Sequence, residues 1–340
     1  MIYMRPATPA DIETLMRISN AVGSGMSSMP TDRQTWQHKL SVSEQSFSKR
    51  VTAPEGEIYF LVMVDGETDQ IVGTAAVYAG VGLDQPFYSY KVSTLVSHSA
   101  ELGKKNTMGV LYLVNDYTGC TEIGSLYLSP DYRRDGNGRF LSRSRFLLLA
   151  DFPERFGDTI IAEMRGWQNA AGKSPFWEHL GRKFFGLGFE NADYMSAVKG
   201  NQFITDLMPR HPIYVDLLPE EARHAIGKPH DASRPALSLL EKEGFRNAGY
   251  IDIFDGGPTV QCQRVNIQTL RQTAHHPVGR IVPDREIGAE TPYIISNGNL
   301  TSYRLVCQPL RIDGDGQAVI GEETARHLQV QPLDRISFAP

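Results

Sequence analysis

Apolar and polar positions follow two different periods along the first half of the chain. Residues 2–5 are short and extended, and Thr8-Pro9-Ala10-Asp11 has the residues typical of a helix start. A helical apolar stripe follows at Ile12, Leu15, Met16 and Ile18. Residues 58–64 are almost all apolar, and an Asp65-Gly66 turn joins them to a second apolar run at 71–79. This pattern predicts a strand, a helix and then a β-hairpin.

The same reading predicts further alternation of strands and helices up to about residue 190. Strands are expected at 108–114, 122–128 and 160–164, and a helix with an apolar stripe is expected over 139–152. Residues 175–185 have a second helical pattern. We expect Gly188-Phe189 to form a turn into another extended segment.

The last quarter of the chain is rich in β-forming residues. The pattern predicts one helix at 322–328 and strands at 293–296, 303–309, 318–320 and 335–338. No low-complexity linker separates this part from the rest, so we expect the parts to pack together. We place a soft boundary between a first domain of residues 1–200 and a second region of residues 201–340.

Composition narrows the class of protein. The 340 residues are 41% hydrophobic and 21% charged, with a formal charge of −5, which is typical of a soluble globular protein and gives no general attraction to nucleic acid or anionic membranes. No apolar run reaches membrane-spanning length, and the N-terminus lacks a secretory pattern. Three scattered cysteines suggest a reducing compartment, so we expect a cytoplasmic protein. No motif predicts a metal site.

The segment between the strand at 122–128 and the helix at 139–152 has the chemistry of an anion site. Gly136 and Gly138 flank Asn137 and let backbone amides approach a ligand closely. Arg133 and Arg134 add positive charge beside the amides of the helix start. A pyrophosphate is the expected ligand. The segment does not match the dinucleotide-binding motif, because the third glycine of that motif is missing. No phosphate-binding loop of the NTPase type is present in the sequence either.

These residues, with Arg5-Pro6-Ala7-Thr8-Pro9-Ala10-Asp11-Ile12, Ile71-Val72-Gly73 and Ser129-Pro130-Asp131-Tyr132-Arg133, resemble the GNAT superfamily of acyl-CoA-dependent N-acyltransferases. The resemblance implies an α/β fold with a mixed, mainly antiparallel twisted sheet and flanking helices. A second α+β region with a β-rich C-terminal part would follow it. It also implies that amides near Arg133, Arg134, Gly136, Asn137 and Gly138 bind the CoA pyrophosphate. The splayed strand before them, including Leu126 and Leu128, would bind the pantetheine.

An ordered set of blocks up to about residue 262 is similar to the arginine N-succinyltransferase family. The blocks include Asn115-Asp116-Tyr117-Thr118-Gly119, Ala162-Glu163-Met164-Arg165-Gly166, Ser174-Pro175-Phe176-Trp177, Leu207-Met208-Pro209-Arg210-His211-Pro212-Ile213-Tyr214 and Asp252-Ile253-Phe254-Asp255-Gly256-Gly257-Pro258-Thr259. The family resemblance implies succinyl transfer from succinyl-CoA, a co-substrate and not a resident cofactor, to the α-amino group of L-arginine. It places the catalytic proton donor at His230 in Gly227-Lys228-Pro229-His230, with His211 as the main competitor, and a succinyl-CoA contact at Leu126.

The three charges of these substrates suggest further binding residues. Arg165 is a candidate clamp for a carboxylate, because guanidinium and carboxylate groups pair through two hydrogen bonds. Asp252 and Asp255 are candidates for the guanidinium of arginine. Structural ion pairs or turn contacts are the alternative roles for all three residues, and the sequence identifies no general base.

Several alternatives stay open. The acceptor could be ornithine, and the donor could be acetyl-CoA. The chain could instead be a non-catalytic acyl-CoA-binding subunit that supports a paralogous partner, since some members of the family work as paired subunits. By the same resemblance we expect a homo-oligomer or a pair with such a subunit. The role of the C-terminal part is not predicted.

Overall fold

The computed structural model describes residues 1–23, 25–200, 202–288 and 291–340. One sixteen-stranded sheet runs through the molecule in the order β14-β15-β11-β16-β12-β13-β1-β2-β3-β6-β7-β10-β9-β4-β5-β8. The strands are β1 (Ile2–Pro6), β2 (Ile58–Asp65), β3 (Gln70–Tyr78), β4 (Ser89–Ser99), β5 (Lys104–Val114), β6 (Thr121–Leu128), β7 (Thr159–Glu163), β8 (Ile213–Tyr214), β9 (Arg246–Asp252), β10 (Pro258–Gln263), β11 (Ala274–Val282), β12 (Tyr293–Ser296), β13 (Leu305–Gln308), β14 (Arg311–Ile312), β15 (Ala318–Gly321) and β16 (Arg335–Ala339).

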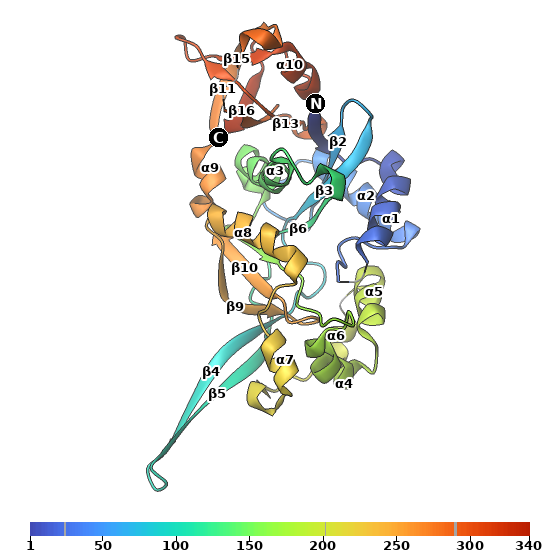
Figure 1. Cartoon of the computed structure of the whole chain (residues 1–340), viewed down its shortest axis with the longest axis vertical. Coiled ribbons are helices and arrows are strands. Elements are labelled where there is room, and N and C mark those ends of the chain that lie inside the picture. The colour runs from blue at the N-terminus through green and yellow to red at the C-terminus, as the bar shows by residue number, and fades with distance from the viewer. Residues whose placement is uncertain (24, 201, 289–290) are drawn as a thin grey trace.

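Helices lie on both sides of this sheet (Figure 1). They are α1 (Ile12–Val22), α2 (Arg33–Ser48), α3 (Asn137–Asp151), α4 (Arg182–Phe185), α5 (Phe189–Lys199), α6 (Gln202–Leu207), α7 (Glu220–Ala225), α8 (Arg234–Glu243), α9 (Gln268–Gln272) and α10 (Glu322–Leu328). Within the described ranges, β6–β7 and β11–β15 are the parallel strand pairs, and the other pairs are antiparallel. The predicted α/β class with a mixed, mainly antiparallel sheet is therefore confirmed. None of the described helices is long and apolar enough to cross a membrane.

The place of strand β2 between two layers of side chains explains why residues 58–64 are all apolar. Tyr59, Leu61 and Met63 belong to the same core cluster as the apolar residues of α3. The alternate residues of β2, such as Phe60 and Val62, pack in a second cluster with α1 and α2. Because successive side chains of a strand point to opposite faces, a strand covered on both faces must be apolar throughout. This arrangement fixes α3, and the loop that precedes it, against one face of the sheet.

The C-terminal strands continue the same sheet, since β13 pairs with β1 through Tyr3–Val306 and Met4–Leu305. The predicted strand at 293–296 and helix at 322–328 lie where the sequence placed them. The division at residues 200/201 stays a prediction. Strands β9 and β10, which follow that boundary, pair with β4 and β7, which precede it.

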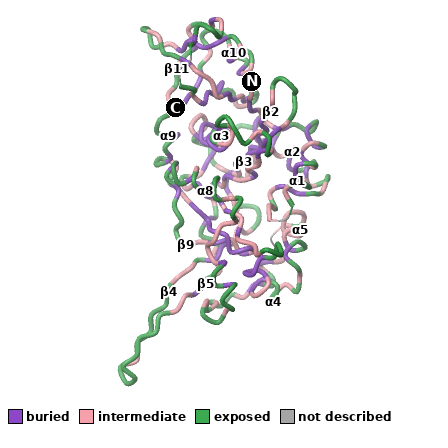
Figure 2. Tube along the Cα trace, in the orientation of Figure 1, coloured by how far each residue is buried: buried purple, intermediate pink, exposed green. Residues whose placement is uncertain are grey.

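Two sequence expectations were wrong or incomplete. The segment after Gly188 is helix α5 and not an extended piece; Gly188 is its extended N-cap and Glu190 lies in its first turn, where an acidic residue is favourable. The strand expected at 108–114 begins earlier, at Lys104, because it pairs with β4 over eleven residue pairs. Together β4 and β5 form a long hairpin that projects away from the body, and its outer part is exposed (Figures 1 and 2).

Candidate active site

Strands β6 and β7 run side by side only at their beginnings. Their parallel pairing consists of Thr121–Ile160 and Glu122–Ile161, although β6 continues to Leu128. Ser125 has a φ of 48°, and the pairing of β6 with β3 shifts register between Thr74 and Ala76. The bulge and the early end of the pairing separate the two strands beyond Glu122. The part of β6 beyond Glu122 is therefore not paired with β7, and the contact of an extended ligand with Leu126 and Leu128 stays a prediction.

The predicted anion loop lies at the far end of β6 and is open to solvent. Arg133, Arg134 and Gly136 are exposed, and Gly136 adopts a φ of 77°, a left-handed conformation that favours glycine. Gly136 is the N-cap of α3, so the amides of Gly138 and Arg139 lie in the first helical turn, where no intrahelical acceptor exists, whereas the amide of Asn137 donates to the carbonyl oxygen of Arg134. The loop thus presents free amide donors at the positive end of a fifteen-residue helix.

Side chains hold this loop in place. Arg133 Nε donates to the carbonyl oxygen of Leu128 at 3.0 Å, which ties the loop to the end of β6. Asn137 Nδ2 donates to the carbonyl oxygen of Tyr132 at 3.1 Å, and the Tyr132 hydroxyl donates to Asp65 at 2.7 Å. Arg134 stays 71% exposed, with Asp135 as a neighbour at 3.5 Å. Arg133 and Asn137 therefore shape the loop, whereas Arg134 is available to a ligand.

A cavity of about 450 Å³ opens where β6 and β7 separate, and acidic side chains line it. Glu122 comes from β6, Glu163 from the end of β7 and Asp252 from the end of β9. Each is partly accessible because it lines the cavity, although it lies deep within the protein. Burial raises the pKa of all three carboxyl groups. For Glu163 the nearby charges of Asp252 and Glu122 raise the pKa further.

One cation faces the β6 side of this cavity. Lys39 of α2 lies under the rings of Trp36, Phe60 and Tyr78, and its Nζ donates to the Tyr78 hydroxyl at 2.7 Å. Burial lowers the pKa of Lys39, and the charge of Glu122 opposes that shift. Glu122 and Lys39 therefore attract each other within the buried part of the site. Sequence reasoning did not assign Glu122, Glu163 or Lys39; a charged residue inside the apolar strand at 122–128 was the available signal.

His230 lies close to the end of β7. Its backbone N–H donates to the carbonyl oxygen of Arg165 at 2.7 Å, and Pro229 forms a bridge with Gly166. The ring Nδ1 accepts from the N–H of Ala232 at 3.1 Å, so the proton of the neutral ring is carried by Nε2. Burial, and then the charge of Arg165, lower the pKa of His230. A neutral ring with a free Nε2–H is a hydrogen-bond donor at neutral pH.

The other predicted binding residues lie in the same area but have different surroundings. Arg165 donates to Gln168 Oε1 at 3.2 Å, while its buried Nε has no partner in the described part of the chain. Burial lowers the pKa of Arg165, and the charge of Asp255 opposes this shift. Asp255 accepts from the backbone N–H groups of Gly166 (2.6 Å) and Gly257 (2.9 Å). Asp255 therefore ties two loops together, whereas Arg165 keeps unused hydrogen-bonding capacity.

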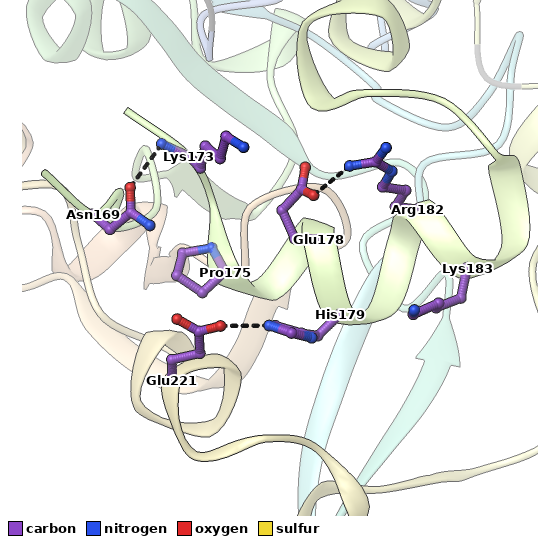
Figure 3. A pocket seen from close by; sticks show the side chains of 8 residues that line it. All are labelled: Asn169, Lys173, Pro175, Glu178, His179, Arg182, Lys183 and Glu221. Carbon is purple, nitrogen blue, oxygen red and sulfur yellow. Dashed lines mark hydrogen bonds and ion pairs between the residues drawn. The ribbon is translucent and has the colours of Figure 1, made fainter. Parts of the chain in front are cut away.

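Another hollow, of about 550 Å³, lies between α4 and α7 and is lined by both basic and acidic side chains (Figure 3). His179 Nε2 is 2.5 Å from Glu221 Oε1, and Arg182 donates to Glu178 at 2.6 Å. Its carboxylates are thus already paired, whereas Glu163 and Asp252 of the cavity at β6 and β7 make no ion pair within the described part of the chain. Among the described residues, no group of three or more His, Cys, Asp or Glu side chains is arranged to hold a metal ion.

Comparison with known proteins shows which family this chain resembles. Residues 2–269 match the family described as "Arginine N-succinyltransferase beta subunit", and residues 276–340 match the family described as the C-terminal domain of the same beta subunit. The arginine N-succinyltransferase subunit beta of Pseudomonas aeruginosa is 39% identical over 339 residues, covering 100% of this chain and 98% of the relative. The arginine N-succinyltransferase of Citrobacter koseri is 38% identical over 321 residues, covering 94% and 92%.

A solved structure resembles the whole chain. The arginine/ornithine succinyltransferase subunit AI from Pseudomonas aeruginosa superposes with a TM-score of 0.91 at 33% identity, and the match covers 100% of this chain and 98% of the other. The family expected from the ordered sequence blocks is thereby confirmed, and the likeness extends through the C-terminal strands. The chain belongs to the arginine N-succinyltransferase family of acyltransferases.

Proposed function

We propose that this chain transfers the succinyl group of succinyl-CoA to the α-amino group of L-arginine by direct attack in a ternary complex, the first step of an arginine-degrading pathway. The observation that carries the proposal is the gap between β6 and β7. It has an exposed anion loop at one end and a cavity lined by carboxylates at the other. A thioester lying along β6 would meet a cationic amine at the point where the strands part.

The loop residues Arg134, Gly136 and Gly138 would bind the pyrophosphate of the co-substrate, with Arg133 and Asn137 holding the loop in shape. The pantetheine would lie along Leu126 and Leu128 and use the backbone edge that β7 leaves free. Arg165 would bind a substrate carboxylate, because its buried Nε keeps a donor that described residues leave unused. The anionic cavity would repel the succinyl carboxylate, which therefore belongs on the Arg165 side.

The chemistry requires an unprotonated amine and a protonated leaving group. The amine nitrogen attacks the thioester carbonyl carbon, the C–S bond breaks, and the thiolate sulfur takes up the proton that the amine has lost, so that CoA leaves as the free thiol. Glu122, beside Lys39 at the parting of the strands, is the group we assign to accept the amine proton. His230 Nε2–H would donate a hydrogen bond to the developing negative charge. Holding both substrates in one geometry supplies a larger effect than either proton step, roughly 7–11 kcal/mol.

Purified protein, tested without any second subunit, should release free thiol when it receives succinyl-CoA and L-arginine. A panel with ornithine as acceptor and acetyl-CoA as donor fixes the specificity, and ornithine is included because the structural relative is named for both amino acids. Binding of CoA without turnover of any acceptor would replace the enzyme assignment by a non-catalytic subunit. Replacement of Arg165 by Ala should raise KM for the substrate whose carboxylate it binds well above the KM of an uncharged analogue.

We also propose that the chain works as an oligomer, either with itself or with a paralogous subunit. The hairpin β4–β5 supports this proposal because it exposes Leu95, Val96 and Tyr112 to solvent. The hairpin also carries Lys91, Lys104 and Lys105, whereas the whole chain is negative. A basic, partly apolar projection fits the acidic surface of a chain of similar composition. Light scattering of the purified chain measures the association.

A further inference from the structure

The acidic residues of the cavity share one face of the sheet. Glu122 is paired with Ile161, and Glu163 follows Ile161 by two residues, so their side chains point to the same side. Thr259 of β10 is the direct partner of Glu163 and lies on that side as well. The row therefore leads from the gap between β6 and β7 across to β10.

The row continues onto β9 and β4. Thr259 is paired with Tyr250, and Asp252 follows Tyr250 by two residues. Ser89 of β4 is in turn the direct partner of Asp252. Four side chains beyond Glu122 thus line up in the order Glu163, Thr259, Asp252 and Ser89. Residues from four strands form one strip of oxygen atoms, which begins at the place where the thioester would lie.

Three oxygens in this strip have no partner. Glu163 Oε1, Thr259 Oγ1 and Ser89 Oγ are buried and make no hydrogen bond within residues 1–23, 25–200, 202–288 and 291–340. Thr259 is 0% exposed and Ser89 is 1% exposed. Leaving a buried polar group unpaired costs about 1–3 kcal/mol, and the cost is greater for a charged group. Of these three residues Glu163 lines the cavity, so its unpaired oxygen is the one that a donor-rich ligand in the cavity can reach.

The charges in the strip are also uncompensated. Lys39 acts on Glu122, but the groups that act on Glu163 are all carboxylates: Asp252, Glu122 and Asp255. Asp252 also has Asp255 as a repelling neighbour, while its Oδ1 accepts from the amides of Phe254 and Asp255. Carboxylates crowded in this way stabilise a cation that enters between them.

From this geometry we propose that the two carboxylates of this strip, Glu163 and Asp252, which both line the cavity, bind the guanidinium group of the acceptor and select arginine over ornithine. The inference rests on the proposed function and adds the residues that determine the acceptor. A guanidinium offers five N–H donors in one plane, whereas an ammonium offers three around a point. The two carboxylates that line the cavity carry four oxygen acceptors, more than the three donors of an ammonium can use, so a guanidinium fits them better.

Binding and kinetics with two isosteric acceptors test the proposal. L-Citrulline has the shape of L-arginine but carries a neutral urea group. For wild-type protein we expect L-arginine to bind at least tenfold more tightly than L-citrulline in calorimetry without a CoA substrate. Glu163→Gln and Asp252→Asn should each raise KM for L-arginine by tenfold or more and leave KM for succinyl-CoA unchanged. The Asn variant keeps the side-chain oxygen that accepts from the amides of Phe254 and Asp255.

Glu243→Gln is the matched control, since Glu243 is also buried but is paired with Arg143 at 3.1 Å and with Thr269. This control should leave the ratio of arginine to citrulline affinity unchanged. If Glu163→Gln weakened both acceptors equally, or left both unchanged, the inference would be overturned. Tight arginine binding without turnover in wild-type protein would support the strip and reject the proposed enzyme activity. Turnover of arginine and citrulline at equal KM would keep the activity and reject the strip.

Discussion

The anion loop at 133–138 and the acidic cavity at β6, β7 and β9 lie at opposite ends of the same gap but are built in opposite ways. The loop is exposed, and its donors come from successive backbone amides at the start of α3. The cavity is buried, and its acceptors come from side chains on strands that are far apart in sequence. A flexible, highly charged co-substrate can be bound at an open helix end. A small amino acid needs an enclosed set of charges for discrimination.

His230 provides the largest expected effect, because it would act on the reaction itself and not on either binding region. His230→Ala removes the Nε2–H donor, and we expect kcat to fall roughly 100-fold with KM for both substrates changed less than threefold. Steady-state kinetics in both substrates measure this split. A kcat close to that of the wild type would reject the role of His230 as a proton or hydrogen-bond donor. A rise in KM alone would move His230 to a binding role.

The next largest effect should appear in CoA binding and not in L-arginine binding, so it distinguishes the loop from the cavity. Gly138→Glu places a carboxylate in the first turn of α3, and we expect the Kd for CoA to rise about 30-fold or more because the site attracts anions. L-Arginine affinity should stay the same. Gly138→Ala is the control: its Cβ would lie 3.9 Å from Leu128 Cδ2, an ordinary contact. Equal CoA affinity for the Glu and Ala variants would show that the pyrophosphate binds elsewhere.

The sequence could indicate an anion loop because all its determinants are contiguous, and the binding role of the loop stays a prediction. Arg133, Arg134, Gly136 and Gly138 stand within six residues, between a strand and a helix that hydrophobic patterning also predicts. The cavity could not be predicted from the sequence in this way, because its side chains come together only through the register of the strand pairs. Only the pairing of β7 with β6 and β10 places Glu163 beside Glu122 and Thr259.

Local patterns also failed where long-range contacts decide the structure. The hairpin β4–β5 was missed in part because its outer positions are exposed on most sides and have little apolar alternation. Helix α5 was read as extended because its polar and apolar residues show no clear helical stripe. Lys39 gave no signal on its helix, since its burial depends on Tyr78 and Phe60 from two strands. Packing between elements that are distant in sequence determines the hairpin, the helix and the burial of Lys39.

The pH dependence of L-arginine affinity is a further way to distinguish the cavity from the loop. Burial and neighbouring carboxylates raise the pKa of Glu163 and Asp252, so these groups hold protons at pH values where free carboxyl groups have lost them. A bound guanidinium favours the ionised forms and releases protons. L-Arginine affinity should therefore increase from pH 5 to pH 7, by at most about tenfold per unit for each proton released. Calorimetry in two buffers with different ionisation enthalpies counts these protons.

Glu163→Gln should flatten this profile, because one titrating group is gone. The CoA affinity of the same variant should follow the wild-type pH profile, since the loop lacks buried carboxyl groups. An arginine affinity that does not change between pH 5 and pH 7 would contradict the ionisation that the cavity requires. A flattened CoA profile would instead show that the two regions are coupled.

The smallest expected effect is on the stability of the protein without substrate. We expect the crowded carboxylates of the cavity to lower the free energy of unfolding. A carboxyl group whose pKa is higher in the folded state than in the unfolded state binds more protons when folded, so it lowers stability as the pH rises above the unfolded value. Glu163→Gln removes this cost, and we expect Tm at pH 8 to rise by roughly 1–3 °C. Near pH 4 the difference should disappear. Thermal unfolding across this pH range measures it.

Glu243→Gln is expected to have the opposite sign, since this change breaks a buried ion pair with Arg143. A carboxylate that supports the fold loses stability when it is neutralised, whereas one that is kept for a ligand gains stability and loses affinity. If Glu163→Gln lowered Tm at pH 8 as Glu243→Gln does, Glu163 would be a structural residue. The cavity would then no longer differ from the paired charges elsewhere in the chain.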